Sequence, residues 1–169
     1  KNRHERPKVD SPYAIATIHR QENTDFKEKL ASIVSELDKI NNELKVVIPL
    51  HPRTSKRMQE YNIQTKIDVL PPVGYLSMLS LLKESEIVIT DSGGVQKEAF
   101  FAKKKCITVR EETEWTELLD IGVNKLTPPK NLYSTFENMI DKKCDFSHRI
   151  YGDGDAGQII VDSILKYVS

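Results

Sequence analysis

An apolar run at residues 86–90 ends directly in Asp-Ser-Gly-Gly, within the segment EIVITDSGGVQKEAF. The run alternates and is rich in β-branched residues, which predicts a buried strand of a parallel sheet, and the residues from Val95 onward predict a helix. The turn between them leaves backbone N–H groups unpaired, and its glycines let a ligand approach the backbone closely. Because the helix dipole favours an anion at that end, the turn predicts a phosphate-binding site. Its candidate residues are Ser92, Gly93 and Gly94.

Glu98 lies four residues beyond Gly94, over the same face of the predicted helix as the turn. A carboxylate repels phosphate, but a nucleotide also carries a ribose diol beside its diphosphate. The Glu98 carboxylate can accept hydrogen bonds from both ribose hydroxyls while the helix start holds the phosphates. The stretch therefore predicts a nucleoside-diphosphate site. The alternative is that Glu98 is an ordinary exposed residue of the helix surface.

Polar side chains also follow three other predicted strands. HRQEN follows the first strand, HPR follows the second, and Arg110 follows the fifth. Ligands of such sheets bind at the carboxyl ends of the strands, where imidazole, guanidinium and free N–H groups would converge on a diphosphate. The candidates from these segments are His19, Arg20, Glu22, His51 and Arg110.

Each of these residues also has a structural alternative. His19 could be a hydrogen-bonded histidine at a strand end, and His51, next to Pro52, could serve the fold alone. Arg110 could pair on the surface with one of the acidic residues at 111, 112 and 114. A DSGG turn is weak evidence by itself, because glycines also serve turns that bind nothing. The prediction depends on the convergence of several strand ends.

The scaffold that would position these residues is an alternation of strands and helices. Short apolar runs predict strands at 13–18, 45–50, 67–70, 86–90, 105–109 and 123–126. Helical spacing predicts helices at 26–42, 54–61, 75–83, 95–102, 114–120, 132–141 and 156–168. This order predicts one α/β domain over residues 1–169, a Rossmann-like, doubly wound and mostly parallel sheet. Residues 1–11 are expected to be a linker, and 156–168 a C-terminal helix.

Composition narrows the class of protein further. The 169 residues suffice for one domain with a real core, and 38% apolar with 30% charged residues is typical of a globular protein. The formal net charge is zero, so composition gives no sign of a basic surface that would bind nucleic acid or an anionic membrane. No apolar stretch reaches membrane-spanning length. No signal-peptide pattern opens the chain, and Cys106 and Cys144 lack metal-ligand spacing, so we expect reduced cysteines in a cytoplasmic protein.

Four motifs, HRQEN, TDSGGVQKEA, VREETEWTE and YGDGDA, resemble in order and spacing the C-terminal half of the non-hydrolysing UDP-N-acetylglucosamine 2-epimerases. The resemblance runs from about residue 13 to the end. It implies the second domain of a glycosyltransferase B type architecture, with the active site between two Rossmann-like domains. The N-terminal domain, which carries the acidic residues assigned to proton transfer, would lie outside this chain. The resemblance also implies a homodimeric full-length protein.

The resemblance implies contacts between the matching residues and UDP. The glycine turn would hold the diphosphate, Glu98 the ribose, and Arg110 a phosphate oxygen. Residues 73–78 match the segment that packs against the uracil. Of these, Val73 and Met78 are the expected contacts, with the Met78 thioether against the face of the base.

The HRQEN motif has a less specific role by the same resemblance. His19 matches a histidine at the nucleotide-sugar site and is the catalytic candidate of this chain. Arg20 and Glu22 belong to the same interdomain motif, which in some members also serves a second, regulatory UDP-sugar site.

The implied reaction inverts carbon 2 and interconverts UDP-N-acetylglucosamine and UDP-N-acetylmannosamine, a precursor step for cell-surface polysaccharide. UDP is eliminated to leave a 2-acetamidoglucal and is then added back, so this domain would bind and stabilise the leaving group. Neither NAD nor a metal is expected, because the chain has no GxGxxG motif and no cluster of metal ligands.

Several alternatives stay open. Lys97 and Trp115-Thr116 differ from commoner forms of the family motifs, so a UDP-diacetamido-uronate or a related deoxysugar is an alternative substrate. Outside the family, the alternatives are the donor-binding domain of a glycosyltransferase and a stand-alone UDP-sugar sensor. The HRQEN motif after the first strand favours the epimerase.

Overall fold

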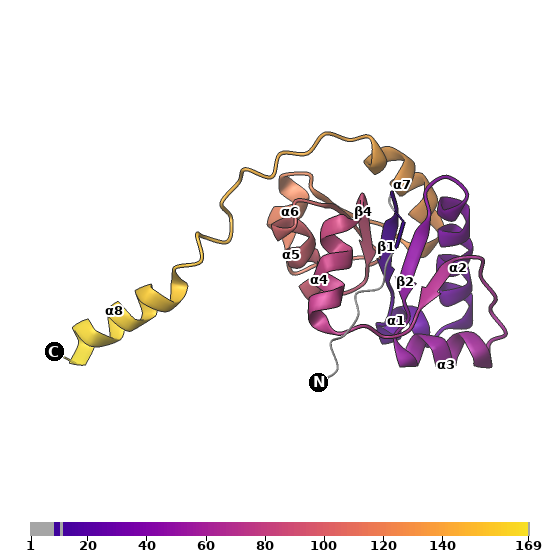
Figure 1. The fold of residues 1–169 in the computed structure, drawn as a ribbon, viewed down its shortest axis with the longest axis horizontal. Coiled ribbons are helices and arrows are strands. Elements are labelled where there is room, and N and C mark those ends of the chain that lie inside the picture. The colour runs from indigo at the N-terminus through magenta and orange to yellow at the C-terminus, as the bar shows by residue number, and fades with distance from the viewer. Residues whose placement is uncertain (1–8, 11, 169) are drawn as a thin grey trace.

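The structure is a computed structural model that describes residues 9–10 and 12–168. Its centre is a six-stranded sheet in the order β3-β2-β1-β4-β5-β6, and every neighbouring pair is parallel (Figure 1). The strands are β1 (Ala14–Thr17), β2 (Val46–Pro49), β3 (Asp68–Leu70), β4 (Ile87–Thr90), β5 (Lys105–Thr108) and β6 (Asn124–Leu126). The predicted strands and the doubly wound α/β class are confirmed, and each strand lies within one residue of its predicted bounds.

The helices follow the predicted alternation. They are α1 (Gln21–Thr24), α2 (Lys27–Asn41), α3 (Pro52–Glu60), α4 (Tyr75–Glu84), α5 (Gly93–Phe101), α6 (Thr116–Asp120), α7 (Leu132–Ile140) and α8 (Ala156–Val168), with a 3₁₀ turn η1 (Pro129–Asn131). Helix α1 and the turn η1 were not predicted, because such short segments show no helical period. Helix α5 begins at Gly93 rather than Val95, so both glycines of the predicted turn lie in its first turn.

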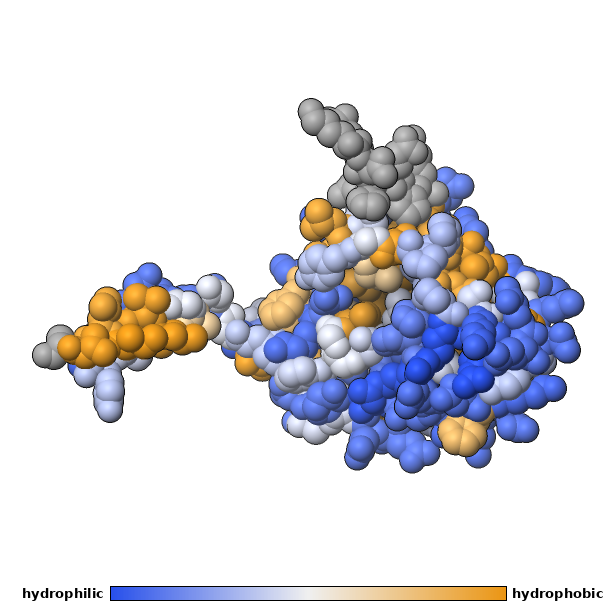
Figure 2. Space-filling view, turned by 90° about the horizontal axis from the view of Figure 1, so that it is seen from below, coloured by the Kyte–Doolittle hydropathy of each residue, from blue (hydrophilic) through white to orange (hydrophobic). Residues whose placement is uncertain are grey.

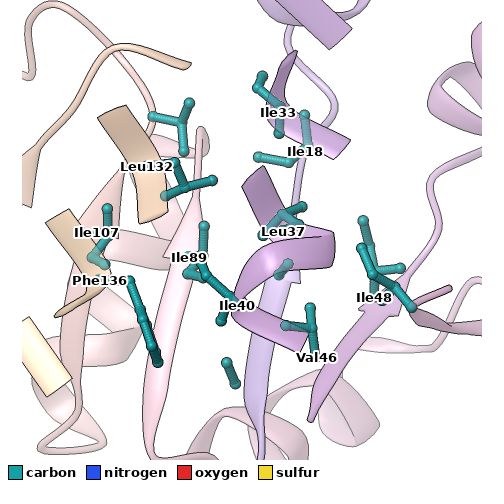
Figure 3. Packing of buried hydrophobic residues seen from close by; sticks show 14 of the residues in the cluster. Ile18, Ile33, Leu37, Ile40, Val46, Ile48, Ile89, Ile107, Leu132 and Phe136 are labelled. Atoms are coloured by element: carbon teal, nitrogen blue, oxygen red, sulfur yellow. The ribbon is translucent and has the colours of Figure 1, made fainter. Parts of the chain in front are cut away.

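Both faces of the sheet are covered, as a parallel sheet requires. Successive residues of β1 point to opposite faces, so Ala14 and Ala16 pack with α2 and α7, while Tyr13 and Ile15 pack with α4 and α5. Figure 3 shows the larger of the two clusters, with side chains of α2, α7 and the central strands interleaved. Its labelled members are Ile18, Ile33, Leu37, Ile40, Val46, Ile48, Ile89, Ile107, Leu132 and Phe136.

The second face contains two buried groups that could otherwise titrate or react. The Tyr13 hydroxyl donates a 2.8 Å hydrogen bond to the carbonyl oxygen of Leu81, and burial raises the pKa of Tyr13 to about 12. Burial likewise raises the pKa of the Cys106 thiol to about 12. Cys106 is therefore a buried packing residue.

The strand order places the switch point of the sheet between β1 and β4. From β1 the chain continues into helices on one face, and from β4 it continues into α5 on the other. The register pairs Thr17 with Thr90, so the two strands end side by side. A crevice forms outside the carboxyl ends at such a point, and ligands of doubly wound sheets bind there. Residues that follow Thr17 and Thr90 are therefore brought face to face.

The chain beyond α7 leaves the sheet in two stages. Residues 144–151 pack a small cluster against α5 and α6, whereas α8 is exposed along its whole length (Figure 1). Apolar side chains gather along one face of α8 (Figure 2). None of the described helices combines the length and apolarity that a bilayer crossing requires. The predicted linker at 1–11 falls mainly on residues 1–8 and 11, which lie outside the described residues.

Candidate functional site

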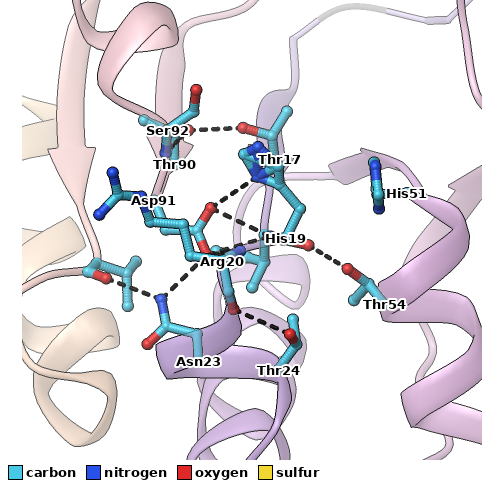
Figure 4. Close-up of polar contacts among 12 residues, drawn as sticks. Thr17, His19, Arg20, Asn23, Thr24, His51, Thr54, Thr90, Asp91 and Ser92 are labelled. Atoms are coloured by element: carbon cyan, nitrogen blue, oxygen red, sulfur yellow. Dashed lines mark hydrogen bonds and ion pairs between the residues drawn. The ribbon is translucent and has the colours of Figure 1, made fainter.

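Asp91, which follows β4, is a fully buried carboxylate at the switch point. Its oxygens accept hydrogen bonds from the backbone amide of His19 at 3.1 Å, the amide of Arg20 at 3.0 Å and the side-chain amide of Asn23 at 3.1 Å (Figure 4). A buried charge is costly unless such donors surround it. The Asp91 carboxylate therefore holds the loop after β1 against the end of β4.

Two further contacts extend this junction to a third strand. The Asn23 side chain also donates to the carbonyl oxygen of Val109 at 3.0 Å, directly beyond β5. The hydroxyls of Thr17 and Thr90 lie 2.7 Å apart across the paired ends of β1 and β4. The three central strand ends are thus joined by hydrogen bonds.

The His19 ring is oriented by the same carboxylate. Its Nδ1 lies 3.2 Å from Asp91 Oδ1, and its side chain is 36% exposed. Only a protonated Nδ1 can donate to a carboxylate, so in the neutral ring Nε2 is left as a free acceptor. His19 can therefore take or give a proton through Nε2.

In His51 the roles of the two ring nitrogens are reversed. Its Nδ1 accepts a 3.2 Å hydrogen bond from the backbone amide of Arg53 and caps α3. The neutral ring must then carry its hydrogen on Nε2, which makes that atom a donor. The His51 and His19 rings lie with centroids 5.5 Å apart. The cap gives His51 a structural role, and its ring also lines the cleft at the strand ends.

A cleft of about 210 Å³ lies beside these two imidazoles. The residues around it come from the carboxyl ends of β1, β2, β3 and β4 and from α4 and α5. They are Thr17, Ile18, His19, Pro49, His51, Pro72, Val73, Met78, Ser92 and Val95. One wall is apolar, and the other carries imidazole and hydroxyl groups. We call this hollow the β1–β4 cleft.

The glycine turn presents free donors at the start of α5. The Ser92 side chain makes no capping bond, and its amide donates to Thr90 Oγ1 at 2.9 Å. Among the described residues, the amides of Gly93, Gly94 and Val95 have no hydrogen-bond partner outside the helix. These donors are available to an anion.

The two glycines of this turn have different surroundings. A Cβ added at Gly93 would lie 2.6 Å from Glu114 Oε1, so a side chain there would displace Glu114. A Cβ added at Gly94 would meet nothing within 4 Å. The open side of the turn is thus at Gly94, and that is where a ligand can approach the backbone.

Glu98 lies on α5 beyond the turn and is half-buried. Burial raises the pKa of Glu98 above its ordinary value. No hydrogen bond or ion pair to its carboxylate is found among the described residues. Its oxygens are therefore unoccupied acceptors, as a contact with a ribose diol requires.

Gln96 is a buried residue that the sequence analysis missed. Its Nε2 donates to the Ser92 carbonyl at 3.3 Å, and its Oε1 accepts from Thr113 at 2.7 Å and from Asn124 at 3.0 Å. The turn is thereby tied to the loop after β5 and to β6. The central role of Asp91 was also missed, and its signal was a charged residue directly after a buried strand.

Arg110 and Glu22 lie around a neighbouring hollow of about 420 Å³ and not in the β1–β4 cleft. Arg110 Nη1 lies 2.7 Å from Glu114 Oε2, and its Nε lies 3.6 Å from Glu22 Oε1. Arg20 pairs with Glu22 at 3.3 Å. The pairing of Arg110 with Glu114 is the contact that its structural alternative names. Glu114 lies between Arg110 and Gly93, so one carboxylate separates Arg110 from the turn.

The described residues hold no group of three or more His, Cys, Asp and Glu side chains that could bind a metal ion.

The chain matches known proteins over most of its length. A family model described as UDP-N-acetylglucosamine 2-epimerase matches residues 1–165. A UDP-N-acetylglucosamine 2-epimerase of Methanocaldococcus jannaschii is 39% identical over 169 residues, covering 94% of this chain and 46% of the relative. A UDP-2,3-diacetamido-2,3-dideoxy-D-glucuronate 2-epimerase of Pseudomonas aeruginosa is 41% identical over 157 residues, covering 91% and 44%. The chain spans about half the length of these curated relatives.

Solved structures show the same similarity to UDP-N-acetylglucosamine 2-epimerases. The M. jannaschii epimerase in complex with UDP-GlcNAc and UDP has a TM-score of 0.83 at 39% identity, covering 92% of this chain and 45% of that one. The Escherichia coli heptosyltransferase WaaC with ADP has a TM-score of 0.53 at 14% identity, covering 75% and 43%, which shows a common fold alone. The chain therefore has the fold of the C-terminal half of a glycosyltransferase B type protein.

Replacing Asp91 with Asn tests whether its charge holds the junction together. The Asn side chain keeps the shape, but its NH₂ would face donors, so the free energy of unfolding should fall by about 1.5–3 kcal/mol, the scale of a charged hydrogen bond. Urea unfolding measures this, with the exposed Asp120→Asn on α6 as the control. Equal stability of the two variants would contradict the role given to Asp91.

Proposed function

The chain belongs to the UDP-N-acetylglucosamine 2-epimerase family, and on that premise we propose that it is the UDP-binding half of such an enzyme. The full enzyme would interconvert UDP-N-acetylglucosamine and UDP-N-acetylmannosamine for the synthesis of cell-surface polysaccharide. The observation that carries the proposal is the convergence, at the carboxyl ends of β1 and β4, of free helix-start amides with an oriented imidazole. The carboxylate of Glu98, which has no partner among the described residues, is the third group.

The proposed placement of UDP follows the chemistry of the walls. The β1–β4 cleft is smaller than the roughly 300 Å³ of an ordinary ligand pocket, so it would take one part of the nucleotide. Its apolar wall at Val73 and Met78 suits the uracil ring. The diphosphate would then lie on the open side of Gly94, and the ribose hydroxyls would bond to Glu98. The relative from M. jannaschii was solved in complex with UDP-GlcNAc and UDP, which supports UDP as the ligand class.

The proposed reaction needs charge stabilisation from this chain. A base removes the proton from carbon 2, the bond from carbon 1 to the UDP oxygen breaks, and UDP leaves as an anion. A proton then returns to carbon 2 from the other face as UDP adds back to carbon 1. The amides at the start of α5 would stabilise the charge that develops on the departing diphosphate. His19 Nε2 is the group of this chain placed to take part in proton transfer.

The proposal for Arg110 requires a change of partner. Arg110 is only 10% exposed and is already paired with Glu114. A phosphate beside Gly94 would compete with Glu114 for the guanidinium, which binds phosphate through two parallel hydrogen bonds. Glu22, on the neighbouring hollow, and Arg20, which pairs with Glu22, would contact the sugar or a second UDP-sugar.

The remaining parts of the proposal concern the whole protein. The carboxylates that act as acid and base would come from an N-terminal domain, which would close over the crevice. The apolar face of α8 is exposed. We propose it as a second surface against which the N-terminal domain packs. We also propose a homodimer in the cytoplasm that needs neither NAD nor a metal. The 41% identity to the diacetamido-glucuronate epimerase makes that sugar nucleotide the second candidate substrate.

Calorimetry with UDP and ADP tests the proposed ligand. UDP should bind roughly tenfold more tightly, about 1.4 kcal/mol, because the β1–β4 cleft of about 210 Å³ suits a single-ring base better than the two rings of a purine. Absence of UDP binding at concentrations on the order of 1 mM would contradict the proposal.

The Glu98→Gln variant separates ribose recognition from a structural role. Binding of UDP and of uridine should weaken by about 1.5–3 kcal/mol, because the charged acceptor is lost. Burial raises the pKa of Glu98, so its contribution to stability is present at low pH and is lost as pH rises through the folded-state value. At pH 7 the thermal midpoint should therefore stay equal or rise slightly.

The control for this variant is Glu86→Gln, at the opposite end of β4. Its exposed carboxylate lies away from the crevice, so it should change neither UDP affinity nor the midpoint. A Glu98→Gln variant with lowered stability and unaltered UDP affinity would show that Glu98 serves the fold.

The chain alone should bind UDP without turning over the sugar nucleotide. Inversion at carbon 2 needs a base on one face and an acid on the other, and among the described residues we assign only His19 to such a role. Incubation with UDP-N-acetylglucosamine in deuterated water should leave deuterium at carbon 2 at the background level. The full-length M. jannaschii relative is the positive control. Deuterium introduced by this chain alone would refute the division of labour between the domains.

A further inference from the structure

The loop after β5 packs onto the start of α5 through one indole. Trp115 Nε1 donates a 2.9 Å hydrogen bond to the carbonyl oxygen of Gly93, inside the glycine turn. The same loop is fixed beside it, because the Trp115 amide donates to Thr113 Oγ1, which itself donates to Gln96. Trp115 is thus positioned from both sides against the turn.

The hydrogen bond bears directly on a proposed phosphate donor. The carbonyl of Gly93 and the amide of Gly94 belong to one planar trans peptide, so their C=O and N–H bonds point in opposite directions. A donor that fixes the carbonyl on one side therefore aims the Gly94 amide the opposite way, toward the N-terminal end of α5. Polarisation through the peptide also makes that amide a better donor.

The indole is in turn held by a cation and a second ring. Lys97 Nζ lies 4.4 Å from the centroid of the Trp115 ring and 4.2 Å from that of Tyr151. The two rings meet edge to face, with centroids 6.1 Å apart and planes at 89°. One ammonium group thus contacts both aromatic rings, a favourable arrangement for each.

Tyr151 connects this stack to the C-terminal part of the chain. It is the last residue of the segment that packs on α5 and α6. Gly152 and Gly154 follow with φ of +75° and +89°, a left-handed backbone that favours glycine, and α8 begins at Ala156. The start of α8 is therefore linked to the glycine turn through Tyr151 and Trp115, and Lys97 contacts both rings.

We propose that Trp115 is a positioning residue for the diphosphate, and that the Lys97–Tyr151 stack makes its position depend on the segment that leads to α8. The inference rests on the proposed binding of UDP at the glycine turn. Trp115 would touch no ligand atom; it would act only by holding the Gly93–Gly94 peptide.

Comparison of UDP with uridine tests the proposal, because only UDP carries the diphosphate. The Trp115→Phe variant keeps the ring and loses the N–H donor. Calorimetry should show UDP binding weakened by about 3- to 10-fold, the effect of one hydrogen bond, with uridine binding within about twofold of the unmodified chain. A general loss of structure would weaken both ligands alike, so the selective loss identifies the positioning role.

Tyr151 variants test the stack separately. Tyr151→Ala should weaken UDP by about 2- to 5-fold, whereas Tyr151→Phe, which keeps the ring, should restore the affinity of the unmodified chain. The matched control is Phe101→Ala: the Phe101 ring contacts Tyr151 at 5.7 Å, and no ring contact joins it to Trp115 or Lys97 among the described residues. Its UDP affinity should not change. Equal losses of UDP affinity in Tyr151→Ala and Phe101→Ala would contradict the role proposed for the Lys97–Tyr151 stack.

Trp115 also provides a direct signal, since it is the single tryptophan of the chain. Its fluorescence should change on titration with UDP and not with uridine. If the unmodified chain binds no UDP, the proposed function fails and this inference falls with it. If the chain binds UDP while Trp115→Phe binds it equally well, the inference alone is overturned.

Discussion

The buried carboxylate of Asp91 is the constraint on which the crevice depends. It lies beyond β4 without exposure to water, and the amides of His19 and Arg20 and the side chain of Asn23 compensate its charge. A charge in that place forces the loop after β1 to turn its donors inward. The same carboxylate then orients the His19 ring, so one interaction closes the switch point and sets the direction of an imidazole.

The structure divides the carboxyl edge of the sheet into two hollows on either side of this junction. One combines an apolar wall with His19, His51 and Ser92, and the other combines Arg110 and Glu22 with further charged residues. At Gly94 the space beside the backbone is open, whereas at Gly93 the Glu114 side chain occupies it. An anion therefore has one side from which to approach, and the crevice is open above it. These features agree with our proposal that the crevice is half of an interdomain site, in which this chain would bind the leaving group.

The sequence predicted the elements better than the contacts between them. β-Branched runs and helical spacing are local signals, and they identified every strand of the sheet and α2 to α8 within a few residues. Helix α1 was missed because QENT is short and polar, although it carries Asn23. A charged residue directly after a buried strand was a signal for Asp91, but its partners depend on the pairing of β1 with β4, which no local pattern reveals. For the same reason the contact of Trp115 with Gly93, and the position of Arg110 on a separate hollow, required the three-dimensional structure.

A crystal structure of this chain with UDP tests the central claim most directly. The account predicts the diphosphate within hydrogen-bond distance of the Gly93 and Gly94 amides, the ribose hydroxyls on Glu98, and the uracil in the β1–β4 cleft beside Val73. The Asp91 hydrogen bonds should be retained. UDP found instead in the hollow beside Lys29 and Pro129, with the glycine turn empty, would contradict it.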